Sequence, residues 1–248
     1  MKVAAVQFAP AFKERDQNIR EGARLIVEAA RNGAHLVVLP ELCTTGFSFM
    51  NEEEAREHAE QISDWQRAGG PTSMEMFGGM ARRLNVAIAW GVLEQDYGTG
   101  TLYNSQVLVL PSGQFISYRK VNLWGNDYLW AKAGTASPPI TDYLGKKVGL
   151  LICRDVRDKA PAMDELYEKG DADIVCFSSN FGDGGFPSGH WVEFAKDNSA
   201  YLIVSNRYGQ EANNNFGEGG ICVIEPSGKV HCDGVVWNAP CIVYAEVP

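Results

Sequence analysis

The 248-residue chain has no long hydrophobic run and no excess of basic charge. Its longest apolar stretches, such as residues 34–40 and 148–153, are strand-sized and far below the roughly 20 residues that span a bilayer. The net charge of −9 argues against nucleic acid or an anionic membrane as a partner, since either would need a basic patch. The N-terminus resembles a first strand rather than a secretion signal, because Gln7 interrupts a short apolar run. We therefore expect a cytoplasmic protein.

Disulfide and zinc-site patterns are also lacking. None of the six cysteines forms a C-x-x-C pair, and the four histidines show no H-x-x-x-H spacing. A structural zinc site would need such spacings, and six cysteines in 248 residues are a low density for a disulfide scaffold. We therefore expect reduced thiols and no metal.

Helical and strand patterns alternate from the start of the chain. Asp16 is expected to cap a helix whose apolar residues recur at intervals of three and four until Gly33. Other helices are expected within residues 52–62, 73–84 and 190–198, and strands at 3–8, 36–39, 86–93, 148–152, 174–177 and 201–205. No Ser/Pro-rich linker interrupts the pattern, so residues 1–248 are expected to form a single domain.

The two halves of the chain resemble each other loosely. Each contains a helix, an apolar strand and later a hairpin with a Pro-Ser-Gly turn, at residues 111–113 and 226–228. An internal duplication would give two sheets packed face to face with helices outside. Pro-Ser-Gly is a common turn, so coincidence is the alternative, and the pattern does not decide between them.

Three segments combine a strand with a reactive side chain just beyond its end. Residues 36–40 lead to Glu41, residues 148–152 to Cys153, and the hairpin strand ending at residue 119 to Lys120. In α/β sheets, ligands bind at this edge. Taken singly, each has an ordinary interpretation as a core thiol, a solvated carboxylate or a surface charge.

Together, the three side chains supply what thiol attack on an amide requires. A thiolate is the nucleophile, and a carboxylate whose pKa is raised by burial is a suitable base. A lysine, with a backbone N–H, can face the oxyanion of the tetrahedral intermediate. We therefore predict that Glu41, Lys120 and Cys153 are catalytic.

Seven motifs stand in a characteristic order along the chain. They are residues 3–10 (VAAVQFAP), 39–42 (LPEL) with 45–47 (TGF), 118–120 (YRK) with Leu123, 150–157 (LLICRDVR), Asn198, 206–207 (NR) and 220–228 (GICVIEPSG). On these motifs the chain resembles the nitrilase superfamily of carbon–nitrogen hydrolases, in its amidase-like branch, along nearly its whole length.

That resemblance implies an α/β fold, a four-layer αββα sandwich of two mixed β-sheets flanked by helices. It implies a Glu–Lys–Cys triad at Glu41, Lys120 and Cys153, a homodimer or higher homo-oligomer, and no metal or organic cofactor. The chain departs from the family pattern where many members carry a histidine, here Asn122, and a second glutamate, where Asp127 is the only acid nearby. The usual Phe-Pro-Glu after the cysteine is replaced by residues 158–161, so the lip of the pocket is unusual.

The predicted function is hydrolysis of a small-molecule amide to a carboxylate plus ammonia or an amine, through a thioester on Cys153. The backbone N–H of Arg154 is expected to join Lys120 at the oxyanion. A nitrile or an N-carbamoyl substrate would use the same triad, and acyl transfer to an amine is a third alternative. A catalytically silent binding protein would carry a broken triad, whereas all three residues are present.

Candidate substrate-binding residues surround the triad in the sequence. They are Trp124, Asp127, Tyr128, Arg154, Asn180 and Phe181. Trp124, Tyr128 and Trp130 offer apolar walls for a pocket, with core or dimer packing as the alternative. A connecting loop is the alternative for Asn180 and Phe181. Arg154 and Arg157 are suited to bind a substrate carboxylate, with local pairing to Asp155 or Asp158 as the alternative, which we favour for Arg157.

Overall fold

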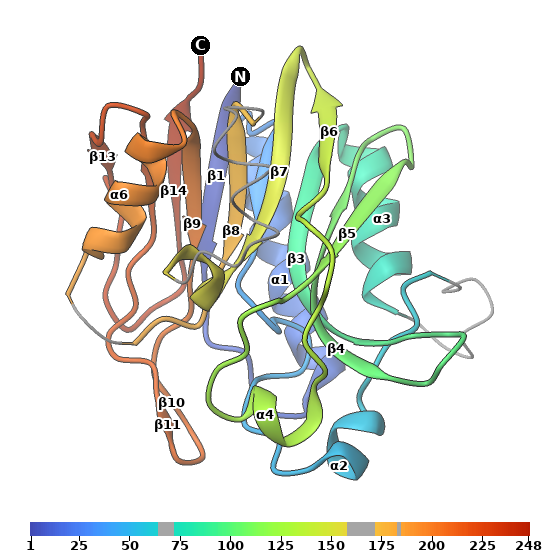
Figure 1. Cartoon of the computed structure of the whole chain (residues 1–248). Coiled ribbons are helices and arrows are strands. Elements are labelled where there is room, and N and C mark those ends of the chain that lie inside the picture. Colours follow the sequence, from blue (N-terminus) through green and yellow to red (C-terminus); the bar gives the residue numbers. More distant parts are fainter. Residues whose placement is uncertain (64–71, 158–171, 183–184) are drawn as a thin grey trace.

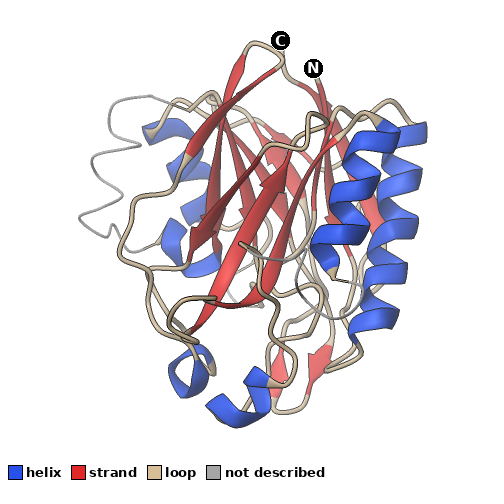
Figure 2. Ribbon diagram, turned by 90° about the vertical axis from the view of Figure 1, so that its right-hand side faces the viewer, coloured by secondary structure: helices blue, strands red, loops and turns tan. Residues whose placement is uncertain are grey.

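The computed structural model describes residues 1–63, 72–157, 172–182 and 185–248. These residues form two six-stranded β-sheets that pack face to face, with helices on the outer faces (Figure 1). Figure 2 shows the layers edge-on, with strands in the middle and helices on either side. The expected four-layer αββα sandwich is therefore confirmed. The replaced family motif at residues 158–161 lies outside the described residues.

The first sheet has the strand order β14-β1-β2-β3-β4-β5. Its strands are β1 (Lys2–Gln7), β2 (Leu36–Val38), β3 (Ala87–Gln95), β4 (Leu102–Val109), β5 (Phe115–Arg119) and β14 (Cys241–Glu246). The three strands β1, β2 and β3 are parallel, while β14, β4 and β5 pair antiparallel with their neighbours. All three residues of β2 are buried and apolar, as expected for a strand covered on both faces.

The second sheet has the order β13-β12-β9-β8-β7-β6. Its strands are β6 (Ile140–Tyr143), β7 (Lys146–Ile152), β8 (Ile174–Ser178), β9 (Tyr201–Ser205), β12 (Cys222–Ile224) and β13 (Val230–His231). A separate small hairpin pairs β10 (Gln210–Glu211) with β11 (Asn214–Asn215).

Both sheets repeat one topology. In the second sheet β7, β8 and β9 are parallel, and they are followed by the antiparallel hairpin β12–β13, just as β1, β2 and β3 are followed by β4–β5. The two Pro-Ser-Gly turns close these hairpins, and Gly113 and Gly228 have φ of 88° and 86°, values that favour glycine. The likeness between the two halves of the sequence therefore corresponds to a repeated strand order.

Helices cover the outer faces of both sheets. Helices α1 (Arg15–Arg31) and α3 (Ser73–Leu84) pack on the first sheet, and α6 (Gly189–Asp197) packs on the second through Trp191 and Ala195. Apolar side chains from both sheets pack against one another in the space between the sheets. Two short helices, α2 (Glu52–Arg56) and α4 (Asp127–Trp130), lie near the same end of the sheets (Figure 1). No helix of the described residues is long and apolar enough to cross a membrane.

One helix prediction needs correction. The residue that precedes α1 is Glu14, which makes no side-chain cap, and Asp16 lies within the first turn, where its charge complements the helix dipole. The helix expected within residues 52–62 is confirmed, and it ends at Arg56. The chain then extends to Glu60, which forms an isolated bridge with Glu94 of β3.

A buried glutamine joins the two sheets beneath one end. Gln106 of β4 accepts a hydrogen bond from the backbone N–H of Leu151 at 3.0 Å and donates to the hydroxyl of Ser178 at 2.8 Å. The Ser178 hydroxyl donates in turn to the carbonyl of Leu39 at 2.7 Å. Because Leu39 and Leu151 each stand two residues before a candidate catalytic residue, these contacts fix the two strand ends relative to each other.

Candidate active site

Glu41 lies just beyond the end of β2, where the chain crosses closely over β3. The N–H of Gly91 donates to the carbonyl of Pro40 at 3.1 Å. A Cβ atom on Gly91 would lie 2.3 Å from the backbone nitrogen of Leu42 and 2.5 Å from the Cα of Glu41. Only a glycine at position 91 therefore allows this path, which turns the Glu41 side chain into the interior, 1% exposed.

Lys120 follows β5 directly, and its backbone is anchored on both sides. Its N–H donates to the carbonyl of Asn104 at 2.8 Å, and its carbonyl accepts from the N–H of Gly134 at 2.8 Å. The Nζ atom donates to Oε1 of Glu41 at 2.7 Å and to Oδ2 of Asp127 at 2.6 Å. The predicted acid and lysine thus form an ion pair that is closed to solvent.

Asn104 and Asp127 complete this group, which we call the charge cluster (Glu41, Asn104, Lys120 and Asp127). The amide of Asn104 donates to Glu41 at 2.8 Å and to Asp127 at 3.0 Å, and the N–H of Trp124 donates to Asp127 at 3.1 Å. Asp127 is fully buried. The structure therefore places Asp127 on the lysine rather than on the surface of a substrate pocket.

Burial and charge act in opposite directions within the charge cluster. Burial raises the pKa of Glu41, and the charge of Lys120 opposes that rise. Burial disfavours the charged form of Lys120, but the carboxylates of Asp127 and Glu41 outweigh it, so the Lys120 pKa is raised. The lysine is therefore a permanent cation, while Glu41 is a carboxylate with an enhanced affinity for a proton.

Cys153 stands at the turn between β7 and the 3-10 helix η2 (Cys153–Val156). Its φ of 41° is left-handed, a conformation that costs a non-glycine residue energy and is common where a nucleophile is exposed on a sharp turn. Burial raises the pKa of its thiol to about 12, and the charge of Glu41 adds to this. The charge of Lys120, the N–H of Asn180 and the hydroxyl of Ser179 oppose the rise.

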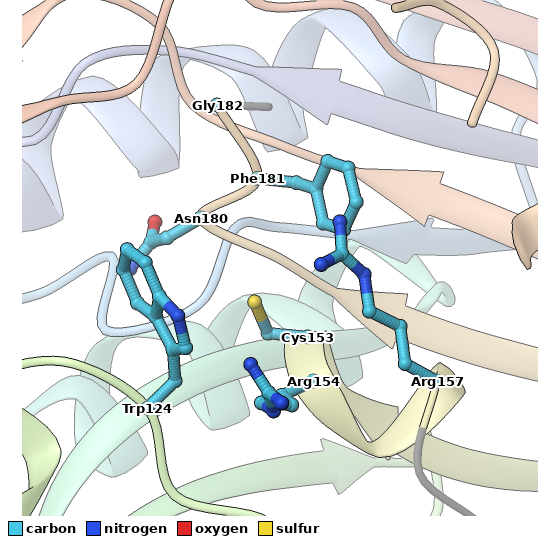
Figure 3. Close-up of a pocket in the computed structure, with 7 residues that line it drawn as sticks. All are labelled: Trp124, Cys153, Arg154, Arg157, Asn180, Phe181 and Gly182. Atoms are coloured by element: carbon cyan, nitrogen blue, oxygen red, sulfur yellow. The ribbon is translucent and has the colours of Figure 1, made fainter. Parts of the chain in front are cut away.

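A small pocket opens over Cys153 (Figure 3). It is lined by Trp124, Cys153, Arg154, Arg157, Asn180, Phe181 and Gly182, and its cavity volume is about 40 Å³. Four of the six residues proposed for substrate binding therefore line it, namely Trp124, Arg154, Asn180 and Phe181. The space suits a small acyl group, because one water molecule needs about 10–15 Å³ by the same measure.

Two aromatic candidates lie elsewhere. Tyr128 is 71% exposed and lines a separate hollow beside α2, so the structure does not bring it to the pocket of Cys153. Trp130 is buried against Phe49, with ring centroids 6.0 Å apart. Trp130 therefore packs in the core and does not form a wall of the pocket.

The arginine at position 157 contacts a residue of the pocket, and its favoured pairing with Asp155 or Asp158 stays a prediction. Its guanidinium lies over the ring of Phe181, with Cζ 4.3 Å from the ring centroid. Asp155 instead accepts from the hydroxyl of Tyr118 at 2.9 Å and from the N–H of Asn122 at 2.7 Å. Asp158, the other acid considered, lies outside the described residues. Arg157 therefore belongs to the pocket wall.

The Tyr118–Asp155–Asn122 contact links the two halves of the site. Tyr118 is on β5, two residues before Lys120, and Asp155 is two residues after Cys153. Burial raises the pKa of Asp155 to about 7, and the hydrogen bonds from Asn122 and Tyr118 and the charge of Lys120 limit the rise. Sequence reasoning missed this carboxylate, Asn104 and Gln106, because a polar residue within or beside a strand is ordinarily read as solvent-facing.

Comparison with known proteins decides the family. The family model described as carbon-nitrogen hydrolase matches residues 2–248. The chain belongs to the carbon–nitrogen hydrolase family. This membership confirms the resemblance to the nitrilase superfamily and makes the chain a hydrolase of carbon–nitrogen bonds.

Other carbon–nitrogen hydrolases resemble the chain over most of its length. A nitrilase of Pyrococcus abyssi is 35% identical over 85% of this chain and 76% of its own length. A deaminated glutathione amidase of Synechocystis is 31% identical over 93% of this chain and 86% of its own length. An amidase structure from Nesterenkonia has a TM-score of 0.83 at 23% identity and covers 100% of this chain and 90% of that one, which shows the shared fold.

Proposed function

We propose that the chain hydrolyses a small-molecule amide to a carboxylate plus ammonia or an amine, through a thioester on Cys153. The observation that carries this proposal is the buried Glu41–Lys120 ion pair, at 2.7 Å, whose two charges act on the thiol of Cys153. A carboxylate, an ammonium group and a sulfhydryl group from three distant segments thus act on one another beside a small pocket.

In the first step, Glu41 removes the proton of Cys153 and the sulfur attacks the amide carbon. The high pKa of the thiol favours its protonated form at rest, so a nearby base is required. The raised pKa of Glu41 makes its carboxylate a stronger base than an exposed one. The cation of Lys120 stabilises the thiolate as it forms.

The tetrahedral intermediate places a negative oxygen near Lys120 and the backbone N–H of Arg154. An ammonium group has three donors, and two of those on Lys120 are used by Glu41 and Asp127. The third is available for the oxyanion. Asp127 and Glu41 hold the ammonium in place, so this donor has a fixed direction.

Collapse of the intermediate breaks the carbon–nitrogen bond. Glu41 gives its proton to the leaving nitrogen, which departs as ammonia or an amine and leaves a thioester on Cys153. Glu41, again a carboxylate, then takes a proton from a water molecule, which attacks the thioester carbon. The sulfur leaves as a thiolate, takes back the proton from Glu41, and a carboxylate product is released.

The comparisons supply two candidate substrate classes. Relatives named as amidases include the deaminated glutathione amidases of Synechocystis and of mouse and an (R)-stereoselective amidase of Pseudomonas. The nitrilase of Pyrococcus abyssi favours a nitrile as the second candidate, since a thiolate can attack either carbon. An amide is preferred because several relatives are named as amidases.

The test is ammonia release from a panel of short aliphatic amides, ω-amides, nitriles and N-carbamoyl amino acids. We expect at least one amide to be hydrolysed by the wild-type protein, and Cys153→Ala to lower its turnover by roughly 10⁴-fold or more. The matched control is Cys176→Ala, a buried thiol of β8 that lies outside the pocket. Near-wild-type turnover in Cys153→Ala contradicts the proposal.

Labelling with iodoacetamide tests the proposed nucleophile independently of turnover. In a catalytically silent protein Cys153 would react no faster than the other five cysteines, whereas an activated thiol reacts faster. Proteolysis and mass spectrometry after brief labelling distinguish the two.

We also propose that residues 1–248 act as a single domain, that the chain forms a homodimer or higher homo-oligomer, and that it works in the cytoplasm. The apolar layer shared by both sheets supports one domain, and six free cysteines suit a reducing compartment. The family resemblance supports the oligomer. Light scattering after size exclusion gives the oligomeric state, and a fluorescent fusion gives the location.

A further inference from the structure

The Asn-Arg motif at residues 206–207 follows β9 directly, and neither of its side chains takes part in the proposed chemistry. Asn206 and Arg207 are each 1% exposed. Burial of a polar side chain is costly unless it forms hydrogen bonds, so the partners of these two residues indicate what the motif does. The contacts of each residue lead to one aromatic wall of the pocket over Cys153.

Asn206 holds the wall formed by Phe181. Its Oδ1 accepts a hydrogen bond from the backbone N–H of Phe181 at 2.8 Å, and its Nδ2 donates to the Phe181 carbonyl at 3.0 Å. An amide side chain has both an acceptor and donors, so one asparagine fixes both backbone groups of this residue. Phe181 lines the pocket, and Figure 3 shows its ring and Trp124 on either side of the sulfur of Cys153.

Arg207 acts through Glu211 of β10. Nη1 of Arg207 donates to Oε2 of Glu211 at 2.6 Å, and the guanidinium lies over the ring of Phe216, with Cζ 4.2 Å from the ring centroid. The other carboxylate oxygen, Oε1, accepts from the backbone N–H groups of Phe47 and Ser48, both at 2.7 Å. Arg207 thus fixes the carboxylate that holds the backbone of Phe47.

Phe47 carries this constraint to the second wall. Its ring packs on that of Trp124, with centroids 6.0 Å apart and planes at 32°, and it meets Phe216 edge to face at 5.8 Å. Phe47 is 1% exposed, whereas Trp124 is 36% exposed and lines the pocket. Side chains in a close-packed interior have few alternative positions, so the buried ring of Phe47 limits the positions open to the indole of Trp124.

We propose that Glu211 is a positioning residue that sets the width of the pocket through Phe47 and Trp124, while Asn206 sets the wall formed by Phe181. This inference rests on the proposed amide hydrolysis and names its selectivity. An unbranched acyl group enters between the two aromatic walls, whereas an acyl group that branches beside the carbonyl carbon is excluded. A cavity of about 40 Å³ has little room for an additional methyl group.

The test compares two isomeric amides, butyramide and isobutyramide, which differ only in branching beside the carbonyl carbon. We expect kcat/KM of the wild-type protein to favour butyramide by at least about tenfold, as for one methylene group in a closely fitting pocket. In Glu211→Ala this ratio should fall below about threefold. The change should lie mostly in KM, because Glu41 and Lys120 keep their own hydrogen bonds.

Two further variants separate positioning from stability. Glu211→Gln keeps an oxygen for the N–H groups of Phe47 and Ser48 but loses the ion pair with Arg207. It should melt at a lower temperature than the wild type and keep most of the selectivity. Phe47→Leu keeps the ion pair but loses the ring that packs on Trp124, so it should remain folded and lose the selectivity.

The matched control is Glu60→Ala. Glu60 is also a buried carboxylate, and it accepts from the N–H and the hydroxyl of Ser73 at 2.7 and 2.9 Å, but it does not line the pocket. Its removal should lower the melting temperature and leave the butyramide to isobutyramide ratio unchanged. An equal change of this ratio in Glu60→Ala and Glu211→Ala would mean that general destabilisation is the cause, which overturns the inference.

Labelling of Cys153 tests the same walls without turnover. Methyl and benzyl methanethiosulfonate transfer a small and a bulky group to a thiol by the same chemistry, and the exposed Cys232 supplies the reference rates. Relative to Cys232, the wild-type Cys153 should prefer the methyl reagent by at least about tenfold. Glu211→Ala and Phe47→Leu should reduce this preference, which mass spectrometry of the two cysteine peptides measures.

The labelling distinguishes this inference from the proposed function. A preference that falls in both variants, without hydrolysis of any amide by the wild type, supports the positioning role and contradicts amide hydrolysis. Unchanged selectivity in hydrolysis and in labelling by folded Phe47→Leu overturns the inference and leaves amide hydrolysis intact. A wild-type protein that hydrolyses isobutyramide as efficiently as butyramide also overturns it.

Discussion

The charge cluster of the first sheet is closed to solvent, whereas the second sheet supplies an open wall. Glu41, Lys120 and Asp127 are each at most 1% exposed, and each is fixed by at least two hydrogen bonds. The second sheet contributes Cys153 and the loops that carry Arg154 and Arg157, whose side chains reach the pocket surface. The proposed acid and lysine thus lie in the buried region, and the residues that line the pocket lie in the open one.

This contrast implies different costs for the same kind of substitution. In the charge cluster, loss of one partner leaves a charge buried without compensation, so stability and activity fall together. At the pocket wall that carries Cys153, removal of a side chain leaves few buried polar groups without a hydrogen-bond partner. Activity therefore falls with a smaller change in stability.

The largest expected effect on stability is that of Lys120→Met. It keeps the volume of the side chain but leaves Glu41 and Asp127 without their cation. We expect the free energy of unfolding to fall by about 3–5 kcal/mol and turnover to fall by at least roughly 10²–10³. Cys153→Ala should abolish turnover at a cost of only about 1 kcal/mol. Urea denaturation at neutral pH measures the free energy of unfolding of both variants. Equal losses in the two variants would contradict the difference between the buried charge cluster and the pocket wall.

Asp155 tests the contact between the two regions. Its pKa is raised to about 7 in the folded protein from its ordinary value of 3.8, so the folded state holds this proton more tightly than the unfolded one. The stabilisation is complete below about pH 4 and is lost as the pH rises through about 7. Relative to Asp155→Asn, the wild type should lose roughly 3–4 kcal/mol of unfolding free energy between these limits.

The comparison with Asp155→Asn isolates one group, because Glu41 and Glu60, whose pKa values are also raised by burial, titrate in both proteins. The asparagine retains an acceptor for the N–H of Asn122. Denaturation curves at a series of pH values provide the test. Parallel stability profiles for the two proteins would show that Asp155 is not the group that titrates.

Gly91→Ala tests how the close approach of β3 to the chain after β2 positions Glu41. The added Cβ would overlap the backbone of Glu41 and Leu42, so we expect a loss of about 1–3 kcal/mol and a fall in turnover of up to about 10²-fold from displacement of Glu41. Gly78→Ala is the matched control, because its Cβ would contact only Val109, at 3.9 Å. It should gain up to about 1 kcal/mol and leave turnover unchanged.

The smallest effect is expected for Tyr128→Ala. This side chain is 71% exposed and outside the pocket of Cys153, so stability should change by less than about 0.5 kcal/mol and KM should not move. Trp124→Ala, which opens the pocket wall, should raise KM. Steady-state kinetics on the same amide decide the matter, and a larger effect at Tyr128 would restore it as a substrate-binding residue.

The sequence predicts the strands and the three candidate catalytic residues because these features are local. A buried apolar run followed by Glu41 or Cys153 is readable in a few letters, and the order of the motifs indicates which runs belong together. The helix predicted within residues 73–84 is confirmed over its full length as α3, and in the structure Thr72 and Asn85 cap its two ends.

What could not be predicted depends on contacts between distant segments. Asn104 is a polar residue in the middle of β4, and only the fold shows that it faces two carboxylates. The four-residue helix α4 buries Trp130 and turns Tyr128 outward. The positions of Trp124, Tyr128 and Trp130 in the sequence do not predict which of them faces the pocket. The contact of Arg157 with Phe181 joins segments 24 residues apart, so no local pattern predicts it.

Mass spectrometry of the protein after brief incubation with a turned-over amide tests the account most directly. The account predicts a mass increase equal to the acyl group on the peptide that contains Cys153, and on none of the other five cysteine peptides. We also expect Glu41→Gln, which lacks the base and acid of the acylation step, to form this adduct far more slowly than the wild type. Hydrolysis at an undiminished rate with no adduct on Cys153, or with the acyl group on another residue, would contradict it.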